Sequence, residues 1–438
     1  MKKKYILSLI LTTVLTLTAC TNPFNASVVT SDKDDDSNSH AVIVSSVDVT
    51  AMDPVSSDSG KDNTVNTTDT DPSGADTSAL DDSWKQIYVD FIENDMDDIL
   101  GDYDLDWFTN WSFGFIYVND DTIPELVISA GYEAGGNVIL TIANGHVDYI
   151  ITSRLGFYYD EKGDYLVNSD GHMGYYFDDV YTIDEDGFVF LKAGVYNDVY
   201  DEDYNYTGEM EYFLDDEEVS EEEYRETIDS YIPMTERIYW NSGSTSDSIM
   251  DYLKGNVYKN YYDAYKAVVK EYLDNEYAHF ALVESDSYAP FLLLDINDWV
   301  YIYYFQDGMA FRGADFYGSY NKNFLYTDTG VVCTYSEYSD NVSLFYSIYT
   351  SSMGSTYFSY ASRNGMYDDN GEFVKDKDGN VLLQYTINSE VVSEMEYAEF
   401  MEQYDSDDCV VLYCASANEE EDYVYSTPDE MYAFLNKR

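Results

Sequence analysis

The sequence contains little positive charge. It has 22 lysines and arginines against 85 aspartates and glutamates, and its formal net charge at pH 7 is −63. A chain of this charge is repelled by nucleic acid and by anionic lipid headgroups. We therefore exclude nucleic acid as a partner. The same charge favours solubility, diffuse binding of counter-cations and attraction to basic proteins.

Histidine is also scarce, and no catalytic motif is present. The four histidines, at positions 40, 146, 172 and 279, lie far apart in the sequence. The sequence has no H-E-x-x-H, no G-x-S-x-G, no Gly-rich phosphate loop and no Cys–His pairing. We therefore nominate no catalytic residue. With so many acidic residues, an extracellular hydrolase that uses a carboxylate pair about 5 to 9 Å apart remains an open alternative.

Cysteine occurs four times, as Cys20, Cys333, Cys409 and Cys414. The last three show no metal-ligand spacing and have no histidine near them. A disulfide between Cys409 and Cys414 is one interpretation. Three buried thiols in strands is the interpretation that the flanking runs VVCTY and CVVLYC favour.

The first twenty residues, MKKKYILSLILTTVLTLTAC, combine three lysines, a short apolar run and the triplet Leu17-Thr18-Ala19 before Cys20. This segment resembles a bacterial lipoprotein signal, in which the cysteine is lipidated and becomes the first residue of the mature protein. We predict a signal peptide at 1–19 and a lipid anchor on Cys20, on the extracellular face of the cell membrane. An uncleaved spanning helix is the alternative, although its apolar run is shorter than the roughly 20 residues that a bilayer requires.

Residues 20–83 are rich in Ser, Thr, Asp and Asn, as in DKDDDSNS and SGKDNTVNTTDTDPSGADTS. Such a segment cannot bury enough apolar surface to offset the entropy lost on ordering. We predict a disordered tether. A chain of this length has a root-mean-square reach of roughly 40 to 45 Å, which would hold the folded part clear of the membrane.

From Ser83 onward the sequence aligns with itself. The matching segments are 84–94 with 265–275, 115–129 with 281–295 without a gap, 139–150 with 302–313, and 211–231 with 384–404. The second match places Pro124 on Pro290. The third places the hairpin turn Asn144-Gly145 on Asp307-Gly308. Such extended similarity indicates an internal duplication.

The repeated segments predict the same elements in both copies. The spacing of apolar residues in 84–94 and 265–275 is typical of an amphipathic helix. Tyr- and Phe-rich runs such as GYYFDDVYTIDEDGFVFLKAGVY alternate apolar and polar residues, as antiparallel strands do. Each closing segment contains Val-Ser-Glu-x-Glu-Tyr. There Ser220 and Ser393 are expected to cap a helix, with Glu223 and Glu396 completing a capping box.

We therefore predict an α+β protein of two tandem related domains. Each domain would have an N-terminal helix, an antiparallel β-meander of about five to seven strands and a closing helix. The first repeat is expected at 84–240, a linker helix at 241–261, and the second repeat, with an additional C-terminal strand and helix, at 262–438.

The stretch FIYVNDDTIPELVIS, residues 115–129, places an acidic turn between two apolar runs. It resembles a degenerate form of the segment Asp-x-Asp-x-Asp-Gly-x-Pro-Glu-Leu, which is found in uncharacterised surface lipoproteins of Gram-positive, clostridial-type anaerobes. A more distant resemblance is to the repeats of calcium-binding β-propellers. A structural turn is the favoured interpretation, because the glycine that calcium loops use is missing. A calcium site is the alternative, with the ligands Asn119, Asp120, Asp121 and Glu125.

Two tryptophans, Trp107 and Trp111, could stack on a sugar ring or a peptide, although burial against the sheet is the commoner role of such rings. Taken together, the sequence favours a lipid-anchored, non-catalytic surface protein that binds a peptide, a glycan or an envelope component. A hydrolase and a calcium-dependent adhesion module are the alternatives. We expect no cofactor other than calcium in the latter case.

Overall fold

The computed structural model describes residues 82–96, 111–201, 204–318, 322–338, 342–368, 371–388, 390–404, 409–417 and 423–438. The predicted signal peptide, Cys20, almost all of the tether and Trp107 lie outside these residues. None of the helices in the described ranges is long and apolar enough to cross a membrane.

The protein is α+β, as predicted. Strands make up about 49% and helices about 20% of the described residues, and the sheets are antiparallel. The dominance of strands follows from the sequence, because 48 tyrosines and 21 phenylalanines suit the half-buried surface of a pleated sheet.

The first half of the described chain begins with the helix α1 (Ser83–Asn94). A meander of four strands follows: β1 (Ser112–Ile116), β2 (Glu125–Ser129), β3 (Asn137–Ala143) and β4 (His146–Ile151). A second meander of six strands continues the chain: β5 (Phe157–Tyr159), β6 (Tyr165–His172), β7 (Tyr175–Asp184), β8 (Gly187–Tyr200), β9 (Tyr206–Leu214) and β10 (Glu217–Val219). The half ends with α3 (Glu221–Asp229), β11 (Ile238–Thr245) and α4 (Ser246–Leu253).

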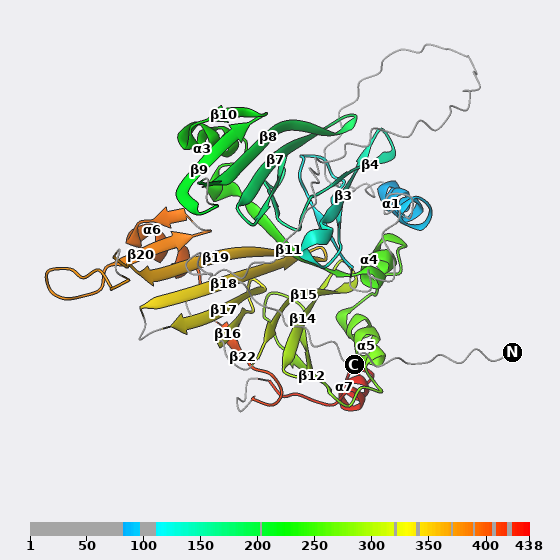
Figure 1. The fold of residues 1–438 in the computed structure, drawn as a ribbon. Helices are drawn as coiled ribbons and strands as arrows, with labels where there is room; N and C mark the ends of the chain where they lie inside the picture. Colours follow the sequence, from blue (N-terminus) through cyan, green and yellow to red (C-terminus); the bar gives the residue numbers. More distant parts are fainter. Residues whose placement is uncertain are drawn as a thin grey trace, which may run out of the picture. The chain divides into compact units, whose positions relative to one another are not determined.

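The second half begins with α5 (Tyr261–Glu271). Its four-stranded meander is β12 (Ala278–Val283), β13 (Phe291–Ile296), β14 (Trp299–Gln306) and β15 (Met309–Tyr317). Six further strands are β16 (Lys322–Tyr326), β17 (Val331–Tyr338), β18 (Ser343–Ser352), β19 (Ser355–Gly365), β20 (Leu383–Ile387) and β21 (Glu390–Val392). The chain closes with α6 (Glu394–Glu402), β22 (Cys409–Leu412) and α7 (Pro428–Leu435), and Figure 1 follows the elements in order.

Local sequence explains several of these boundaries. Asn144 and Gly145 have φ of 52° and 80°, and Asp307 and Gly308 have φ of 48° and 83°. Each pair joins two adjacent strands as a two-residue turn, as expected for Asn-Gly and Asp-Gly. Ser393 forms a complete capping box, whereas Ser220 shows its first bond, from the Glu223 N–H to Ser220 Oγ (3.2 Å).

Strand β11 joins the two halves. It pairs antiparallel with β1 and β5 of the first half and with β19 of the second half. The turn between β18 and β19 reinforces this junction, because the Phe115 N–H donates to the Met353 carbonyl (3.1 Å). The described strands form two sheets. One is a large sheet of 18 strands drawn from both halves, and the other is the separate four-stranded sheet β12–β15.

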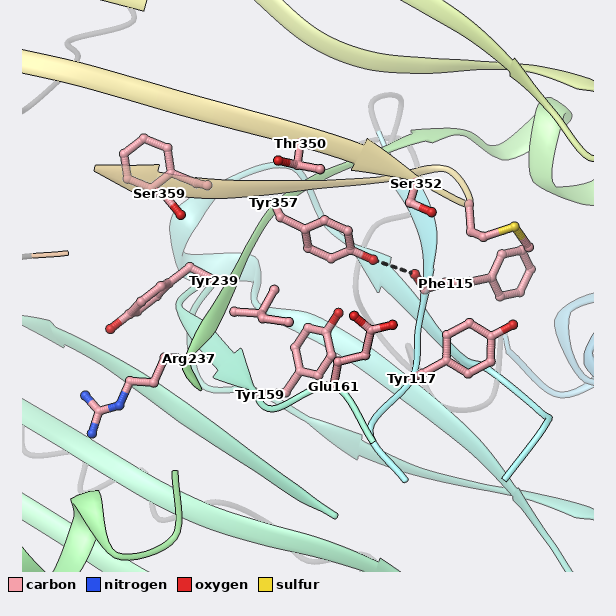
Figure 2. Close-up of a pocket in the computed structure, with 13 residues that line it drawn as sticks. Phe115, Tyr117, Tyr159, Glu161, Arg237, Tyr239, Thr350, Ser352, Tyr357 and Ser359 are labelled. Carbon is pink, nitrogen blue, oxygen red and sulfur yellow. Dashed lines mark hydrogen bonds between the residues drawn. The ribbon is translucent and has the colours of Figure 1, made fainter. Parts of the chain in front are cut away.

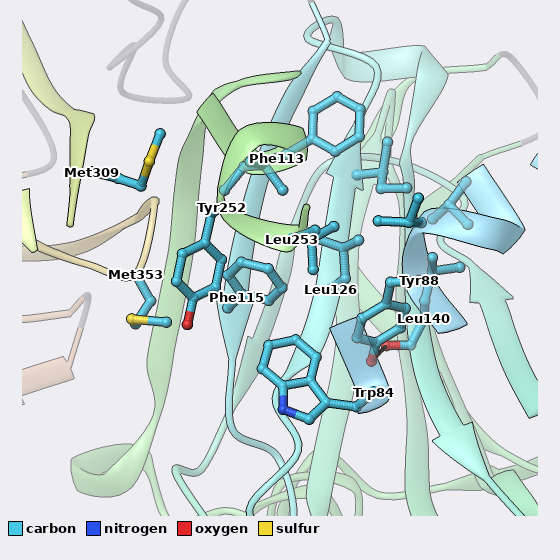
Figure 3. Close-up of a cluster of buried hydrophobic side chains, with 14 of the residues drawn as sticks. Trp84, Tyr88, Phe113, Phe115, Leu126, Leu140, Tyr252, Leu253, Met309 and Met353 are labelled. Atoms are coloured by element: carbon cyan, nitrogen blue, oxygen red, sulfur yellow. Dashed lines mark hydrogen bonds between the residues drawn. The ribbon is translucent and has the colours of Figure 1, made fainter. Parts of the chain in front are cut away.

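The apolar core beneath β1 to β3 also draws on both halves. Figure 3 shows Trp84 of α1 and Tyr252 of α4 packed against Phe115 of β1, with Tyr88 of α1 beside Leu140 of β3. Side chains of the second half complete this cluster, namely Met309, Phe311 and Met353. These buried side chains hold the end of β1, and with it the acidic turn, in a fixed position.

Candidate functional site

The acidic turn closes around a buried glutamate. Glu125 is 1% exposed and opens β2. The Val118 N–H donates to its Oε2 (2.8 Å), and the Thr141 hydroxyl donates to its Oε1 (3.1 Å). Burial raises the pKa of Glu125 to about 8, despite the hydrogen bond from Val118 that opposes the shift. Glu125 therefore joins β1, β2 and β3 from inside the protein.

The other residues of the turn are directed at one another and at the backbone. The Ile123 N–H donates to Asp121 Oδ1 (2.7 Å), and the Asp121 N–H donates to Asn119 Oδ1 (3.1 Å). The Asn119 amide donates to Asp121 Oδ2 (3.2 Å), while Asp120 is exposed. The side-chain oxygens of Asn119 and Asp121, two of the residues named as possible calcium ligands, thus accept hydrogen bonds within the turn itself. Glu125 lies on the buried side of the turn.

A second group of side chains could hold a metal ion. Carboxylate oxygens of Asp295 and Asp298 and the sulfur of Cys414 lie within 4.8 Å of one another. Its atoms also have partners within the chain. Asp295 accepts from the Asp298 N–H (2.9 Å) and from the Ala415 N–H, and Ser416 Oγ donates to Asp298 Oδ1 (2.5 Å). These bonds tie the turn between β13 and β14 to the segment after β22.

The three cysteines of the described residues are free thiols. There is accordingly no Cys409–Cys414 disulfide in this structure. The expectation of three buried thiols in strands is wrong at two positions, because Cys409 is only half-buried and Cys414, although buried, lies after β22. Burial raises the pKa of Cys333 to about 12, so this thiol is a poor nucleophile.

Trp111 is the one tryptophan of the predicted stacking pair that the structure describes. It is half-buried, its ring lies 6.4 Å from that of Phe113, and it packs against the core of Figure 3. Packing against this core is the burial expected for most such rings.

A cavity lined by tyrosines, hydroxyl groups and two charged side chains lies where β11 joins the two halves. Its volume is about 350 Å³, in the range of small-ligand pockets. Figure 2 shows its lining, which comes from β1, β5, β11, β18, β19 and the adjoining turns. The lining residues are Phe115, Tyr117, Tyr159, Glu161, Arg237, Ile238, Tyr239, Thr350, Ser352, Met353, Tyr357, Phe358 and Ser359.

Hydrogen bonds fix the aromatic wall of this tyrosine pocket. The Tyr357 hydroxyl donates to the Phe115 carbonyl (3.2 Å), and Ser355 Oγ donates to the same carbonyl (2.9 Å). The indole N–H of Trp240 in turn donates to Ser355 Oγ (3.0 Å). The Tyr159 and Tyr357 rings lie 6.3 Å apart. The wall is therefore rigid before any ligand arrives, which lowers the entropy lost on binding.

Glu161 is the acidic residue of the pocket lining, and it is exposed at the mouth. The next residue, Lys162, donates its N–H to the Tyr117 carbonyl (2.9 Å), which holds the turn carrying Glu161 against the end of β1. In Figure 2 the Glu161 carboxylate lies near Tyr117, Tyr159 and Tyr357. Its negative charge contributes to raising the pKa of each of these three phenols, in addition to the effect of burial.

Arg237 is the basic residue of the lining, and its charge is already balanced. Its guanidinium pairs with Asp229 at 2.5 Å and donates from Nε to the Ile232 carbonyl (3.2 Å). It also lies over the Tyr158 ring, 4.4 Å from the centroid. Arg237 therefore supports the wall of the pocket more than it supplies free positive charge.

Sequence reasoning did not find this pocket. Its residues are spread from position 115 to position 359 and share no motif. The sequence is visibly rich in tyrosine, and Tyr117 lies two residues before Asn119 of the acidic turn, but no signal in the sequence links Tyr117 to Glu161 or to Tyr357.

Comparisons of the chain with protein-family models, with curated proteins and with solved structures found no match.

Proposed function

We propose that the protein is a non-catalytic binding module that holds a small ligand, or one residue of a larger ligand, in the tyrosine pocket. We further propose that Cys20 anchors it by a lipid to the extracellular face of the membrane, and that the bound molecule is a peptide, a glycan or another envelope component. The observation that carries the binding proposal is a preformed cavity walled by Tyr117, Tyr159, Tyr357 and other aromatic rings. Such rings supply a large contact area and a polar hydroxyl with little loss of rotamer freedom.

The chemistry of the lining supports binding over hydrolysis. A glycosidase of the usual kind requires two carboxylates about 5 to 9 Å apart, and the lining contributes one, Glu161. The lining also contains three hydroxyl side chains, Thr350, Ser352 and Ser359. It contains no histidine that could activate one of them as a nucleophile. The residues present can stack, donate and accept hydrogen bonds, and offer one negative charge.

A binding experiment tests the proposal. The mature chain would be titrated with short oligosaccharides and with short acidic and basic peptides, each at increasing concentration, while heat and product formation are recorded. We expect saturable binding of at least one probe without turnover, and a loss of about tenfold in affinity for Tyr117→Ala. Tyr277→Ala is the matched control, since Tyr277 is an exposed tyrosine outside the pocket lining. Turnover of a probe, or binding that Tyr117→Ala leaves unchanged, would overturn the proposal.

We also propose that residues 83–253 and 261–435 are two copies of one α+β unit. The order of elements supports it: a helix, four strands, six strands, a helix, a strand and a helix occur in each half. In both halves the final strand pairs with the first strand of the six-stranded meander, as β11 with β5 and β22 with β16. This correspondence would assign all of β11 and α4 to the first unit, whereas we predicted a boundary after residue 240, inside β11, and a linker helix at 241–261.

Two buried tyrosines support the same proposal. The Tyr88 hydroxyl of α1 donates to the carbonyls of Pro124 (2.8 Å) and Leu140 (3.2 Å). The Tyr265 hydroxyl of α5 donates to the carbonyls of Pro290 (2.6 Å) and Tyr303 (3.4 Å). These contacts match Tyr88 with Tyr265, one helical turn away from the sequence alignment, which had placed Trp84 there. A shift of four residues preserves the amphipathic pattern, so the pattern could not distinguish the two alignments.

The first strand of each unit also differs from the gap-free alignment. Glu125 pairs with Ile116, whereas Phe291 pairs with Val283, so the second turn is one residue shorter. Matching these pairs sets Phe115 opposite Leu282 in place of Ala281. Because side chains alternate between the faces of a strand, this one-residue difference decides which residues face the helix.

A further inference from the structure

The charges around the tyrosine pocket narrow the class of ligand. Burial is the main cause of the raised pKa values of Tyr117 and Tyr159, and the negative charges of Glu161 on both phenols and of Asp307 on Tyr117 add to it. Two carboxylates, Glu161 and Asp307, therefore lie close enough to act on the rings of the pocket, in a chain whose net charge is −63.

Two positively charged side chains, Arg237 and Lys162, lie near the pocket. Arg237 is paired with Asp229 and stacked on Tyr158. Lys162 is exposed, and its Nζ lies 5.2 Å from the centroid of the Tyr117 ring. Its position shows that the face of this ring can receive a cation, and an exposed lysine can move aside at little cost because water replaces its contacts.

We propose that the tyrosine pocket recognises a cationic nitrogen group, an alkylammonium or a guanidinium, that enters beside Glu161 and contacts the rings of the half-buried Tyr117 and Tyr357. The inference rests on the proposed binding function and specifies its ligand. Aromatic faces attract a cation through their quadrupole, and a carboxylate at the mouth adds charge attraction and a hydrogen-bond acceptor. The cavity of about 350 Å³ accommodates such a side chain together with part of its backbone.

The same features disfavour other ligands. An anionic group would meet Glu161 without a free cation of the lining to pair with, because Arg237 is engaged by Asp229. A neutral sugar could stack on the rings, but its affinity would not depend on the charge of Glu161. Dependence on that charge therefore separates a cationic ligand from a glycan.

The test compares three blocked amino acids that differ at the end of the side chain: the N-acetyl methylamides of lysine, arginine and norleucine. Each is titrated calorimetrically into the mature chain. We expect the lysine or arginine probe to bind about tenfold more tightly than the norleucine probe, and to weaken when salt is raised from about 0.05 to 0.5 M. Equal affinity for the three probes would overturn the inference.

Point variants locate the effect. Glu161→Gln should remove most of the preference for the charged probe while leaving the norleucine affinity unchanged, and Lys162→Gln should strengthen binding of the charged probe because a competing cation is removed. Glu185→Gln is the matched control, since Glu185 is an exposed acid in the turn between β7 and β8. A charge preference that survives Glu161→Gln, or falls equally in Glu185→Gln, would contradict the pocket assignment.

Further probes show whether the cation belongs to a polypeptide or to a small amine. They also distinguish failure of the cation inference from failure of the proposed binding function. Binding of a blocked Gly-Lys-Gly peptide more tightly than n-butylammonium would support a polypeptide ligand, and equal binding would support a small amine. If chitotriose binds in a manner that depends on Tyr117 but not on Glu161, the cation inference fails while the binding function stands. If none of the probes binds, both fail.

Discussion

At the scale of single residues, the acidic turn shows how a carboxylate can serve the fold. Glu125 is buried and accepts hydrogen bonds from Val118 and Thr141, so it fastens the end of β1 to β2 and β3. Asp121 and Asn119 use their oxygens to cap backbone N–H groups of the turn. The geometry assigns each of these side chains a place in the turn, with Glu125 on its buried side.

Glu125 makes stability depend on pH. Its pKa is about 8 in the folded protein against an ordinary value of 4.5, so the folded state keeps a proton that the unfolded state loses in this interval. Stability from this group is complete below pH 4.5 and is lost as the pH rises towards 8, by up to about 1.4 kcal/mol per pH unit. We expect urea denaturation at several pH values to show this decline in the wild type and a flatter profile in Glu125→Gln. Parallel profiles would contradict the assignment.

Calcium distinguishes the turn from the alternative metal site. If the turn is structural, millimolar calcium should shift the melting temperature slightly and diffusely, and Asp120→Asn should leave that shift in place, because the acidic chain attracts cations everywhere. A true site would add about 2.7 kcal/mol at a hundredfold excess over Kd. A calorimetric signal for one bound calcium that disappears in Glu125→Gln would establish the site, with Asp286→Asn as the control in the second half.

At the scale of elements, the first helix of each half, α1 or α5, is attached to the strands beneath it by the hydroxyl of one buried tyrosine. Tyr88 and Tyr265 are fully buried, and each donates to a proline carbonyl and to a strand carbonyl. The apolar faces of α1 and α5 supply most of the packing, but the hydroxyl determines how far along its axis each helix lies, because its bond has a definite length and direction.

Removing either hydroxyl should destabilise the fold by a similar amount. Tyr88→Phe and Tyr265→Phe each leave a buried proline carbonyl without this partner, at a cost of about 1 to 3 kcal/mol. Chemical denaturation of both variants measures the effect, and Tyr277→Phe, at an exposed position, should change little. A large effect at one site with none at the other would argue against equivalent roles for the two helices.

At the scale of the whole molecule, the pairing of β11 with β19 brings the two halves together and creates the pocket. The first half supplies Tyr117, Tyr159 and Glu161, and the second half supplies Tyr357. A ligand in this cavity would contact both halves at once, so binding would stabilise their junction by mass action.

The proposed membrane attachment also concerns the whole molecule. If Cys20 carries the lipid, Cys20→Ala should move the protein from the membrane fraction to the soluble fraction, because the hydrocarbon chains supply the binding energy. The melting temperature should stay unchanged, since the described fold begins some sixty residues later, at 82. Fractionation followed by immunoblotting tests this, and a variant that remains with the membrane would contradict the lipoprotein prediction.

Much of the local structure was accessible from the sequence. The Asn-Gly and Asp-Gly turns, the caps at Ser220 and Ser393 and the alternating strands depend on neighbouring residues, because φ preferences and side-chain periodicity act over a few positions. These signals were sufficient for the α+β class. They could not detect a shift of one helical turn, which preserves the amphipathic pattern, or a shift of one residue in β1, because all five residues of β1 are buried and show no alternation.

The tertiary structure decided what local pattern leaves open. It turned Glu125 inward, brought Glu161 beside Tyr117 through the Lys162 N–H, and set Tyr357 against the Phe115 carbonyl from more than two hundred residues away. Contacts across such separations depend on how strands pair and which faces are buried, and different strand pairings are compatible with the same local preferences. The sequence by itself therefore determined the charge, the class and the elements, whereas the pocket exists only because β11 and β19 meet.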